Sequence, residues 1–298
     1  MDILTQLPAR ARVLLIRLRS LGDCVLTTPA IRILKSARPD LSVSVIVEPR
    51  FEAVFTGNPD IETILPPTHA NAWSSRASLA INLHGGTRSL VLTALSRARF
   101  RAGFAHYRHG FVHNVKIPTA QEILGLTRKV HTAEHLASAM FFLGAPRQEI
   151  PRACLFAQPL PISNPYAVIH PIAATPAKTW PSQRFLHAAE HIAHKGLEPI
   201  FIGGPGDNLE PFARYRCLTG QPLEQTKSIL AGASLFLGND SGPAHVAAAF
   251  GLPVAVLFGA SDPVVWAPWK TAAEQIIAPD GLANLGTAPV LAAIDRLL

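Results

Sequence analysis

The sequence is poor in cysteine. Its three cysteines, Cys24, Cys154 and Cys217, lie far apart, and no CxxC pair occurs. Zinc knuckles and disulfide frameworks both need paired or clustered cysteines. The spacing therefore argues against both kinds of site and indicates reduced thiols, as in a cytosolic protein.

Several motifs of nucleotide-binding and hydrolytic enzymes are missing as well. There is no Walker phosphate loop, no GxGxxG after the first apolar run, and no GxSxG nucleophile elbow. There is also no Asp-x-Asp pair of the sort that holds a divalent metal on a nucleotide diphosphate. These absences argue against the enzyme classes that depend on those motifs.

The chain also lacks a long uninterrupted apolar run. The longest, at residues 246–260, is broken by Gly251 and Pro253, whereas a membrane-spanning helix needs about 20 apolar residues. The apolar run at residues 13–16 is short and has arginines on both sides, unlike a signal peptide. We therefore expect a cytoplasmic protein without a transmembrane segment, for which peripheral membrane attachment stays open.

What the sequence does have is length, apolar residues and an uneven charge. Its 298 residues, 48% of them hydrophobic, suit two domains of about 150 residues. Residues 1–150 hold 18 Lys and Arg against 10 Asp and Glu, and residues 151–298 hold 9 against 10. A basic first half attracts anionic lipid, phosphorylated glycolipid or nucleic acid, unless the charge merely keeps that face soluble. Because no nucleic-acid motif accompanies it, we expect no nucleic-acid partner.

Short apolar runs alternate with helical patterns along the chain, which predicts an α/β protein with parallel sheets. The expected strands are residues 12–18, 41–47, 79–83, 166–170, 198–202, 235–237 and 254–258. The expected helices are residues 25–37, 132–143, 182–195, 223–231, 241–250 and 288–298. A proline-rich stretch at residues 145–165 reads as a linker. The pattern predicts an N-terminal domain at 1–150 and a C-terminal domain at 151–298.

The first group of candidate site residues is Ser20-Leu21-Gly22-Asp23, which directly follows the first strand. Ligands of α/β proteins lie beyond the carboxyl ends of the strands. Gly22 lets a ligand approach the backbone closely, and Asp23 faces it. Alternatively, Asp23 only caps the following helix.

The second group is GNDSGPAH at residues 238–245, between a strand and a helix of small residues. Asp240 or Ser241 can cap that helix, and the N–H groups of Ser241 and Gly242 suit a diphosphate. His245 lies one turn further on. The third group is the small-residue loop at 170–181, in which Lys178 can neutralise a phosphate and Thr175 can donate a hydrogen bond. Lys178 can equally be a solvated surface residue.

Taken together, these segments resemble glycosyltransferase family 9, whose members include the ADP-heptose:lipopolysaccharide heptosyltransferases. The resemblance is carried by RVLLIRLRSLGDCVLTTPAIRIL (12–34), HPIAATPAKTWPSQRF (170–185), GGPGD (203–207) and GNDSGPAHVAAAFGLPVAVLFGASDP (238–263). INLHGGTRS (81–89) and HTAEHL (131–136) are similar to acceptor-domain segments of the family. The matches span nearly the whole chain in the family's order.

The resemblance implies a GT-B fold of the α/β class, with two facing Rossmann-like doubly wound domains and an interdomain cleft. It implies an inverting reaction without a metal or other cofactor, in which the first domain binds the acceptor and the second the donor. Asp23 matches the catalytic base and Lys178 a donor-phosphate lysine. The other implied donor-binding residues are Thr175, Asp240, Ser241, Gly242 and His245, and the acceptor-side candidates are Ser20, Gly22, His84 and Arg88. Some relatives have consecutive threonines where this chain has Ala173 and Ala174.

The implied donor is a nucleotide sugar, ADP-heptose above others. The implied acceptor is an anionic glycolipid of the bacterial cell envelope, the lipopolysaccharide core, at the cytoplasmic surface of the inner membrane. Two alternatives remain at this point. One is an epimerase-like enzyme that acts on the nucleotide sugar without an acceptor, and the other is a non-catalytic protein that binds a nucleotide or an anionic lipid.

Overall fold

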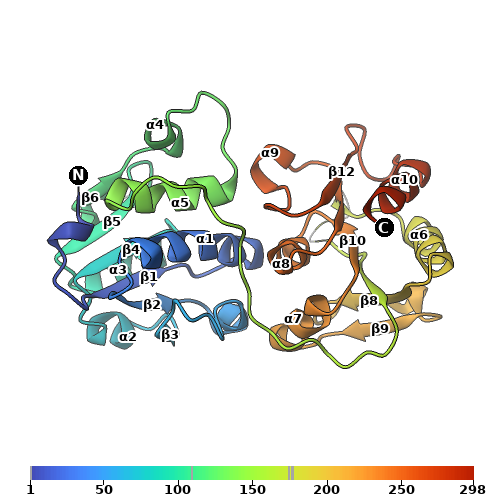
Figure 1. The fold of residues 1–298 in the computed structure, drawn as a ribbon, viewed down its shortest axis with the longest axis horizontal. Helices are drawn as coiled ribbons and strands as arrows, with labels where there is room; N and C mark the ends of the chain where they lie inside the picture. The colour runs from blue at the N-terminus through green and yellow to red at the C-terminus, as the bar shows by residue number, and fades with distance from the viewer. Residues whose placement is uncertain (1, 109, 174, 176–177) are drawn as a thin grey trace. The chain divides into compact units, whose positions relative to one another are not determined.

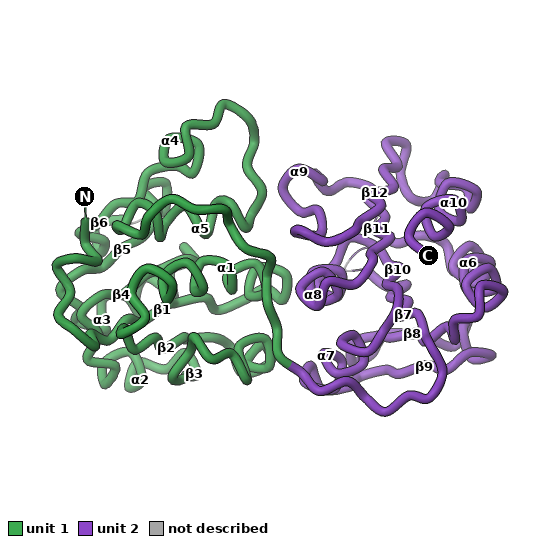
Figure 2. Tube along the Cα trace, viewed as in Figure 1, with its two compact units in different colours: residues 1–156 green, residues 157–298 purple. Residues whose placement is uncertain are grey.

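The computed structural model describes residues 2–108, 110–173, 175 and 178–298. The chain divides into two compact units, residues 1–156 and 157–298 (Figure 2). Each unit is built on one parallel six-stranded sheet with helices packed against it (Figure 1). In the described ranges, no helix combines the length and the apolar character needed to cross a membrane.

Unit 1 has the strand order β3-β2-β1-β4-β5-β6. Its strands are β1 (Arg12–Ile16), β2 (Ser42–Ile46), β3 (Thr63–Leu65), β4 (Leu79–Asn82), β5 (Phe100–Phe104) and β6 (Val115–Ile117). Its helices are α1 (Leu21–Ala37), α2 (His69–Ser74), α3 (Thr87–Leu95), α4 (Ala120–Leu124) and α5 (Thr132–Leu143), with 3-10 turns η1 (Leu4–Gln6), η2 (Pro49–Val54) and η3 (Gly110–Val112).

The two faces of this sheet carry different helices. Leu14 and Ile16 of β1 are fully buried in one cluster with Ala72 of α2 and Leu92 of α3. The chain leaves β1 toward β2 in one direction and leaves β3 toward β4 in the other, so right-handed crossovers place α1 on the face opposite α2 and α3. Helix α5 packs beside α1. The loops that follow β1, β2 and β4 meet at the carboxyl edge of the sheet.

Unit 2 repeats the arrangement with the order β12-β11-β10-β7-β8-β9. Its strands are β7 (Tyr166–His170), β8 (Glu198–Gly203), β9 (Arg216–Thr219), β10 (Leu235–Asn239), β11 (Val254–Phe258) and β12 (Ala273–Ile277). Its helices are α6 (Ser182–His194), α7 (Leu223–Ala231), α8 (Gly242–Phe250), α9 (Pro263–Trp266) and α10 (Ala288–Leu297), with the 3-10 turn η5 (Glu210–Phe212). Counted from its central strands outward, each sheet has the doubly wound order of a Rossmann-like domain.

One expected helix boundary is wrong. Helix α1 begins at Leu21 rather than at residue 25, which puts Pro29 inside the helix instead of in its first turn. A proline in a helix interior leaves the carbonyl four residues earlier without its usual donor. Here that carbonyl belongs to Val25, and the Thr28 hydroxyl donates to it at 2.8 Å. The neighbouring threonine thus replaces the missing N–H and lets the helix continue.

Candidate active site

The carboxyl edge of the unit 1 sheet holds Asp23 in a fixed position. One Asp23 oxygen accepts a hydrogen bond from the Arg17 guanidinium at 2.9 Å, and the other accepts from the Ser20 hydroxyl at 3.1 Å. Arg17 also donates to the Thr27 hydroxyl at 3.3 Å. The Arg17 side chain is 7% exposed and that of Asp23 is 24% exposed. The carboxylate is therefore held from the protein side while part of it stays open to a ligand.

The alternative that Asp23 merely caps α1 is wrong. Ser20 occupies the N-cap position, and Asp23 is the third residue of the helix. No side-chain capping hydrogen bond is present at that N-cap. The Asp23 carboxylate instead pairs with Arg17. Arg17 directly follows β1, and its side chain points toward α1. Gly22 is buried in the first turn between Ser20 and Asp23.

The loop after β4 forms the next part of this edge. Asn82, the last residue of β4, is completely buried, and its side-chain oxygen accepts from the N–H groups of His84 and Gly85 at 3.0 and 3.1 Å. Gly85 has φ +83°, and an added Cβ would lie 2.5 Å from the Tyr107 ring. Both observations require glycine there. The turn consequently presents His84 toward the Asp23 edge.

His84 and Arg88 have different surroundings at this edge. Burial lowers the pKa of His84, and the charges of Arg17 and Arg19 lower it further, against the opposing effect of Asp23. A neutral imidazole is the expected form. Arg88 lies in the first turn of α3, where its guanidinium donates to the Pro67 carbonyl at 3.1 Å and is 58% exposed. The guanidinium also lies 3.7 Å from a Glu48 carboxylate oxygen, and its exposed part can still reach an anionic ligand.

An aromatic cluster behind this edge was not predicted from the sequence. The His135 ring stacks on Phe104 with ring centroids 4.0 Å apart, and His106 and Tyr107 lie around the same phenylalanine. Burial, with smaller contributions from His106 and Arg17, lowers the pKa of His135 to about 4. The only sequence signal was the HTAEHL segment, which does not say that its second histidine meets residues 104–107.

The carboxyl edge of the unit 2 sheet gathers the residues expected to bind the donor. The Lys178 ammonium lies 3.8 Å from an Asp240 carboxylate oxygen. The Ser241 hydroxyl shares a 3.1 Å hydrogen bond with Nδ1 of His170, the last residue of β7. Burial lowers the pKa of His170 to about 4, which favours the neutral ring. His170 is a member of this group that the sequence did not single out.

The loop between β7 and α6 is anchored by one buried side chain. Asn239, at the end of β10, donates to the Pro171 carbonyl at 2.9 Å and accepts from the Trp180 N–H at 3.1 Å. Trp180 itself is fully buried and donates its indole N–H to the Leu285 carbonyl at 2.8 Å. Both ends of the loop are thus fixed to β10. Thr175 is exposed on the loop, and Ala174 lies outside the described residues.

Helix α8 completes this edge. Ser241 occupies its N-cap position but makes no capping hydrogen bond, because its hydroxyl turns to His170. Gly242 is the first residue of α8, and the first N–H groups of a helix have no acceptor within it. His245 is buried one turn further on, with its ring centroid 6.3 Å from that of Trp266. The helix start therefore provides N–H donors and a positive dipole end for an anion.

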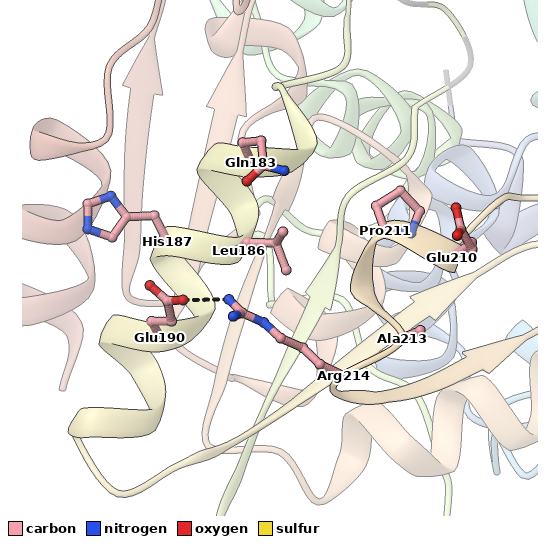
Figure 3. A pocket seen from close by; sticks show the side chains of 8 residues that line it. All are labelled: Gln183, Leu186, His187, Glu190, Glu210, Pro211, Ala213 and Arg214. Carbon is pink, nitrogen blue, oxygen red and sulfur yellow. Dashed lines mark hydrogen bonds and ion pairs between the residues drawn. The ribbon is translucent and has the colours of Figure 1, made fainter.

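No predicted site residue lines the pocket of about 500 Å³ between α6 and η5 (Figure 3). Its charged walls include Glu190 and Arg214, which form an ion pair at 2.5 Å. Across the part of the chain that the structure describes, no group of three or more His, Cys, Asp or Glu side chains is arranged to hold a metal ion.

Comparison with known proteins identifies the family of the chain. The family model for glycosyltransferase family 9 (heptosyltransferase) matches residues 74–285. The chain belongs to glycosyltransferase family 9. It is accordingly a glycosyltransferase of the α/β class, and its two Rossmann-like domains agree with the expected GT-B fold.

Relatives extend this family 9 assignment over almost the whole chain. Lipopolysaccharide heptosyltransferase 3 of Escherichia coli is 25% identical over 93% of this chain and 96% of its own. A family 9 glycosyltransferase structure from Veillonella parvula has a TM-score of 0.86 at 22% identity, covering 100% and 98% of the two chains. The E. coli heptosyltransferase WaaC, solved with ADP, has a TM-score of 0.80 at 20% identity, covering 96% and 100%.

Proposed function

We propose that this family 9 enzyme transfers a heptose, or a related sugar, from an ADP-sugar to the lipopolysaccharide core or a related surface glycolipid. The reaction is inverting and needs no metal. The observation that carries the proposal is the held but accessible Asp23 carboxylate at the carboxyl edge of unit 1. The relatives named as lipopolysaccharide heptosyltransferases and the related structure solved with ADP support this choice of substrates.

Asp23 acts as the general base in this proposal. It takes the proton of an acceptor hydroxyl while that oxygen attacks the anomeric carbon of the donor sugar. The new C–O bond forms opposite the bond to the diphosphate, which breaks and releases ADP. Such a base contributes about 10²–10⁴-fold to the rate. Arg17 and Ser20 fix the two carboxylate oxygens, so that one geometry is presented to the acceptor.

The unit 2 edge stabilises the departing diphosphate. Negative charge grows on the phosphate oxygens as the C–O bond breaks, and preorganised donors lower the barrier most effectively. Lys178 supplies a positive charge, and Thr175 supplies a hydroxyl on the same loop. The N–H groups at the start of α8, with Ser241, Gly242 and His245 around them, supply the remaining donors. The Asp240 carboxylate, 3.8 Å from the Lys178 ammonium, holds that lysine near the start of α8.

The acceptor side uses the basic character of unit 1. Arg88 is exposed beside the β4 loop, and His84 is neutral and half-buried on it. We assign these residues, together with Ser20 and Gly22, to an anionic glycolipid acceptor. An enzyme with such an acceptor works as a cytoplasmic protein that meets the inner membrane from its cytoplasmic face.

Calorimetric titration with ADP, UDP and GDP in EDTA, followed by a transfer assay with ADP-heptose and a lipopolysaccharide core acceptor, tests the proposal. We expect ADP to bind tightest and Lys178→Ala to weaken it about tenfold or more, because a charge-assisted contact to phosphate is lost. Exposed Lys195→Ala is the matched control. Preference for UDP or GDP would overturn the ADP-sugar assignment. Donor turnover without an acceptor would indicate an epimerase-like enzyme, and nucleotide binding without any turnover a binding protein.

A further inference from the structure

One stretch of unit 1 contains no acidic residue. Between Glu62 and Glu122 the sequence has neither Asp nor Glu. The cationic residues within it are Arg76, Arg88, Arg97, Arg99, Arg101, Arg108 and Lys116. This stretch builds β3, β4, β5, β6, α2, α3 and η3. The positive excess of the first half of the chain is therefore concentrated in one structural block.

The exposed elements of this block cover a single face of the sheet. Ala72 of α2 and Leu92 of α3 pack into the same cluster beneath that face, and η3 packs against α3. The block therefore presents α2, α3 and η3 side by side to solvent. We call this surface the α2–α3–η3 face.

Large apolar side chains stand exposed on this face. Phe111 of η3 is 83% exposed, Trp73 of α2 is 56% exposed, and Val91 of α3 is 41% exposed. Each comes from a different element of the face. Exposed aromatic residues of this size cost solubility unless a partner covers them, so they mark an interaction surface.

The same block carries cations without acidic partners. Arg76, Arg97 and Arg99 are exposed, and none forms an ion pair with a carboxylate of the described residues. The Arg97 guanidinium lies over the Trp73 ring, 4.5 Å from its centroid. The ring thereby carries a cation on its face. Exposed aromatic side chains together with unpaired arginines suit the boundary between acyl chains and anionic headgroups.

We propose that the α2–α3–η3 face docks on an anionic lipid bilayer. Phe111 and Trp73 enter the headgroup layer, and Arg76, Arg97 and Arg99 pair with lipid phosphates. The partner is a bilayer rather than a nucleic acid because exposed aromatic tips and an exposed Val91 have apolar acyl chains to contact there. This inference rests on the proposed function only for the biological source of the membrane.

The docked orientation serves the proposed acceptor. Helix α3 begins at the carboxyl edge with Arg88 in its first turn, and its exposed residues Thr87, Val91 and Ala94 follow the helix toward the opposite edge. With this stripe on the bilayer, one helix layer about 10 Å thick separates the sheet from the lipid. A saccharide rising from a lipid anchor then passes Arg88 before it reaches Asp23.

Co-sedimentation with vesicles tests the docking face without any glycosyl transfer. The probes are vesicles of phosphatidylglycerol and phosphatidylethanolamine, compared with vesicles of phosphatidylcholine alone. We expect the full chain to bind the anionic vesicles at least tenfold more strongly. Phe111→Ala/Trp73→Ala and Arg97→Asn/Arg99→Asn should each lower that binding about tenfold. Asparagine is chosen because Arg97 has a positive φ of 54°, which asparagine tolerates.

Matched controls come from other surfaces. Val264→Ala/Ile277→Ala removes two apolar residues of unit 2 that are 50% and 55% exposed. Arg32→Asn removes a cation of α1, 62% exposed, on the opposite face of unit 1. Both should bind vesicles like the unchanged chain. Equal losses in controls and face variants, or no preference for anionic vesicles, would overturn the proposal.

Transfer to a delipidated, water-soluble core oligosaccharide separates this proposal from the proposed function. The face variants should transfer sugar to that acceptor at the unchanged rate. They should lose at least fivefold in rate with acceptor embedded in anionic vesicles. If the unchanged chain binds vesicles but transfers no sugar, the proposed function fails and the docking face stands. If transfer to vesicle-embedded acceptor is equally fast in the face variants, the docking face fails alone.

Discussion

The fourth strand of each unit ends in an asparagine, but the two asparagines hold different loops. Strands β4 and β10 hold equivalent places in the two sheets, and each ends in a completely buried asparagine. Asn82 closes the loop that follows it, by accepting from His84 and Gly85, and its amide nitrogen makes a long contact of 3.5 Å with Nε2 of His113. Asn239 instead bridges Pro171 and Trp180, which belong to the loop after another strand. The same residue at the same place thus shapes its own loop in unit 1 and a neighbouring loop in unit 2.

This difference suits the two chemical tasks that the proposed reaction sets. Unit 1 has to present one carboxylate to a hydroxyl, and Arg17 and Ser20 near Asp23 in the sequence do this locally. Unit 2 has to assemble donors for a diphosphate, and these come from two loops that only a long-range clamp can hold together. A doubly wound scaffold therefore does not fix which loops it ties together.

The largest expected effect is on catalysis in unit 1. Asp23→Asn should lower the rate of sugar transfer by about 10²–10⁴-fold, because the amide cannot accept the proton. Affinity for ADP, measured by calorimetry, should stay within about twofold, since the donor edge lies in unit 2. Asp60→Asn, which removes another ion-paired carboxylate of unit 1, is the matched control. Transfer at the unchanged rate by Asp23→Asn would remove this residue from the mechanism.

The next largest expected effect is a loss of stability and of ADP affinity that distinguishes the two asparagines. Asn239→Ala leaves the Trp180 N–H and the Pro171 carbonyl without partners, and each buried unpaired group costs about 1–3 kcal/mol. Asn82→Ala frees N–H groups of half-buried residues that water can reach, and among the described residues it otherwise loses only the long 3.5 Å contact with His113. We therefore expect Asn239→Ala to destabilise more in urea unfolding and to weaken ADP binding, and Asn82→Ala to leave ADP binding unchanged. Equal losses of ADP affinity in both variants would contradict the distinction between a local and a long-range clamp.

The sequence predicted the centre of each sheet better than its edges. Residues 166–170 and 254–258 are strands with the expected bounds, because both are buried apolar runs. Strands β9 and β12 were missed, since an edge strand needs only partial burial and theirs includes Arg216, Glu274 and Gln275. Strands β3, β5 and β6 of unit 1 were also not placed, although β5 lies inside its sheet. The helix at residues 132–143 was also placed correctly, because glycine follows it at residue 144.

The partners of the candidate site residues were harder to predict. His170 and Ser241 are 71 positions apart, and Trp180 and Asn239 are 59 apart. Nothing local in the sequence joins such residues, because the contacts arise only when parallel strands bring their carboxyl ends to one edge. Arg17 lies only six positions before Asp23, but residue 17 continued an apolar run and was assigned to the strand. The available signal for this ion pair was a charged residue at the end of a buried strand.

The smallest expected effect is a loss of stability in acid, with one histidine in each unit. The pKa of His135 in unit 1 and of His170 in unit 2 is lowered by burial to about 4, whereas an unfolded histidine titrates near 6.5. Between these pH values the unfolded chain binds more protons, so stability falls as the pH drops from about 6.5 to about 4. Each histidine should contribute on the order of 2–3 kcal/mol to this fall.

Non-titrating replacements test the two histidines separately. His170→Asn keeps a donor and acceptor near the Nδ1 position, and His135→Phe keeps the stack on Phe104. Each should reduce the difference between urea unfolding free energies measured at pH 7.5 and pH 4.5, while exposed His194→Asn should not. If only His170→Asn changes the acid sensitivity, unit 2 unfolds first in acid and the donor edge is the weaker of the two. If only His135→Phe changes the acid sensitivity, unit 1 unfolds first in acid, and the aromatic cluster behind Asp23 limits the acid stability of the protein.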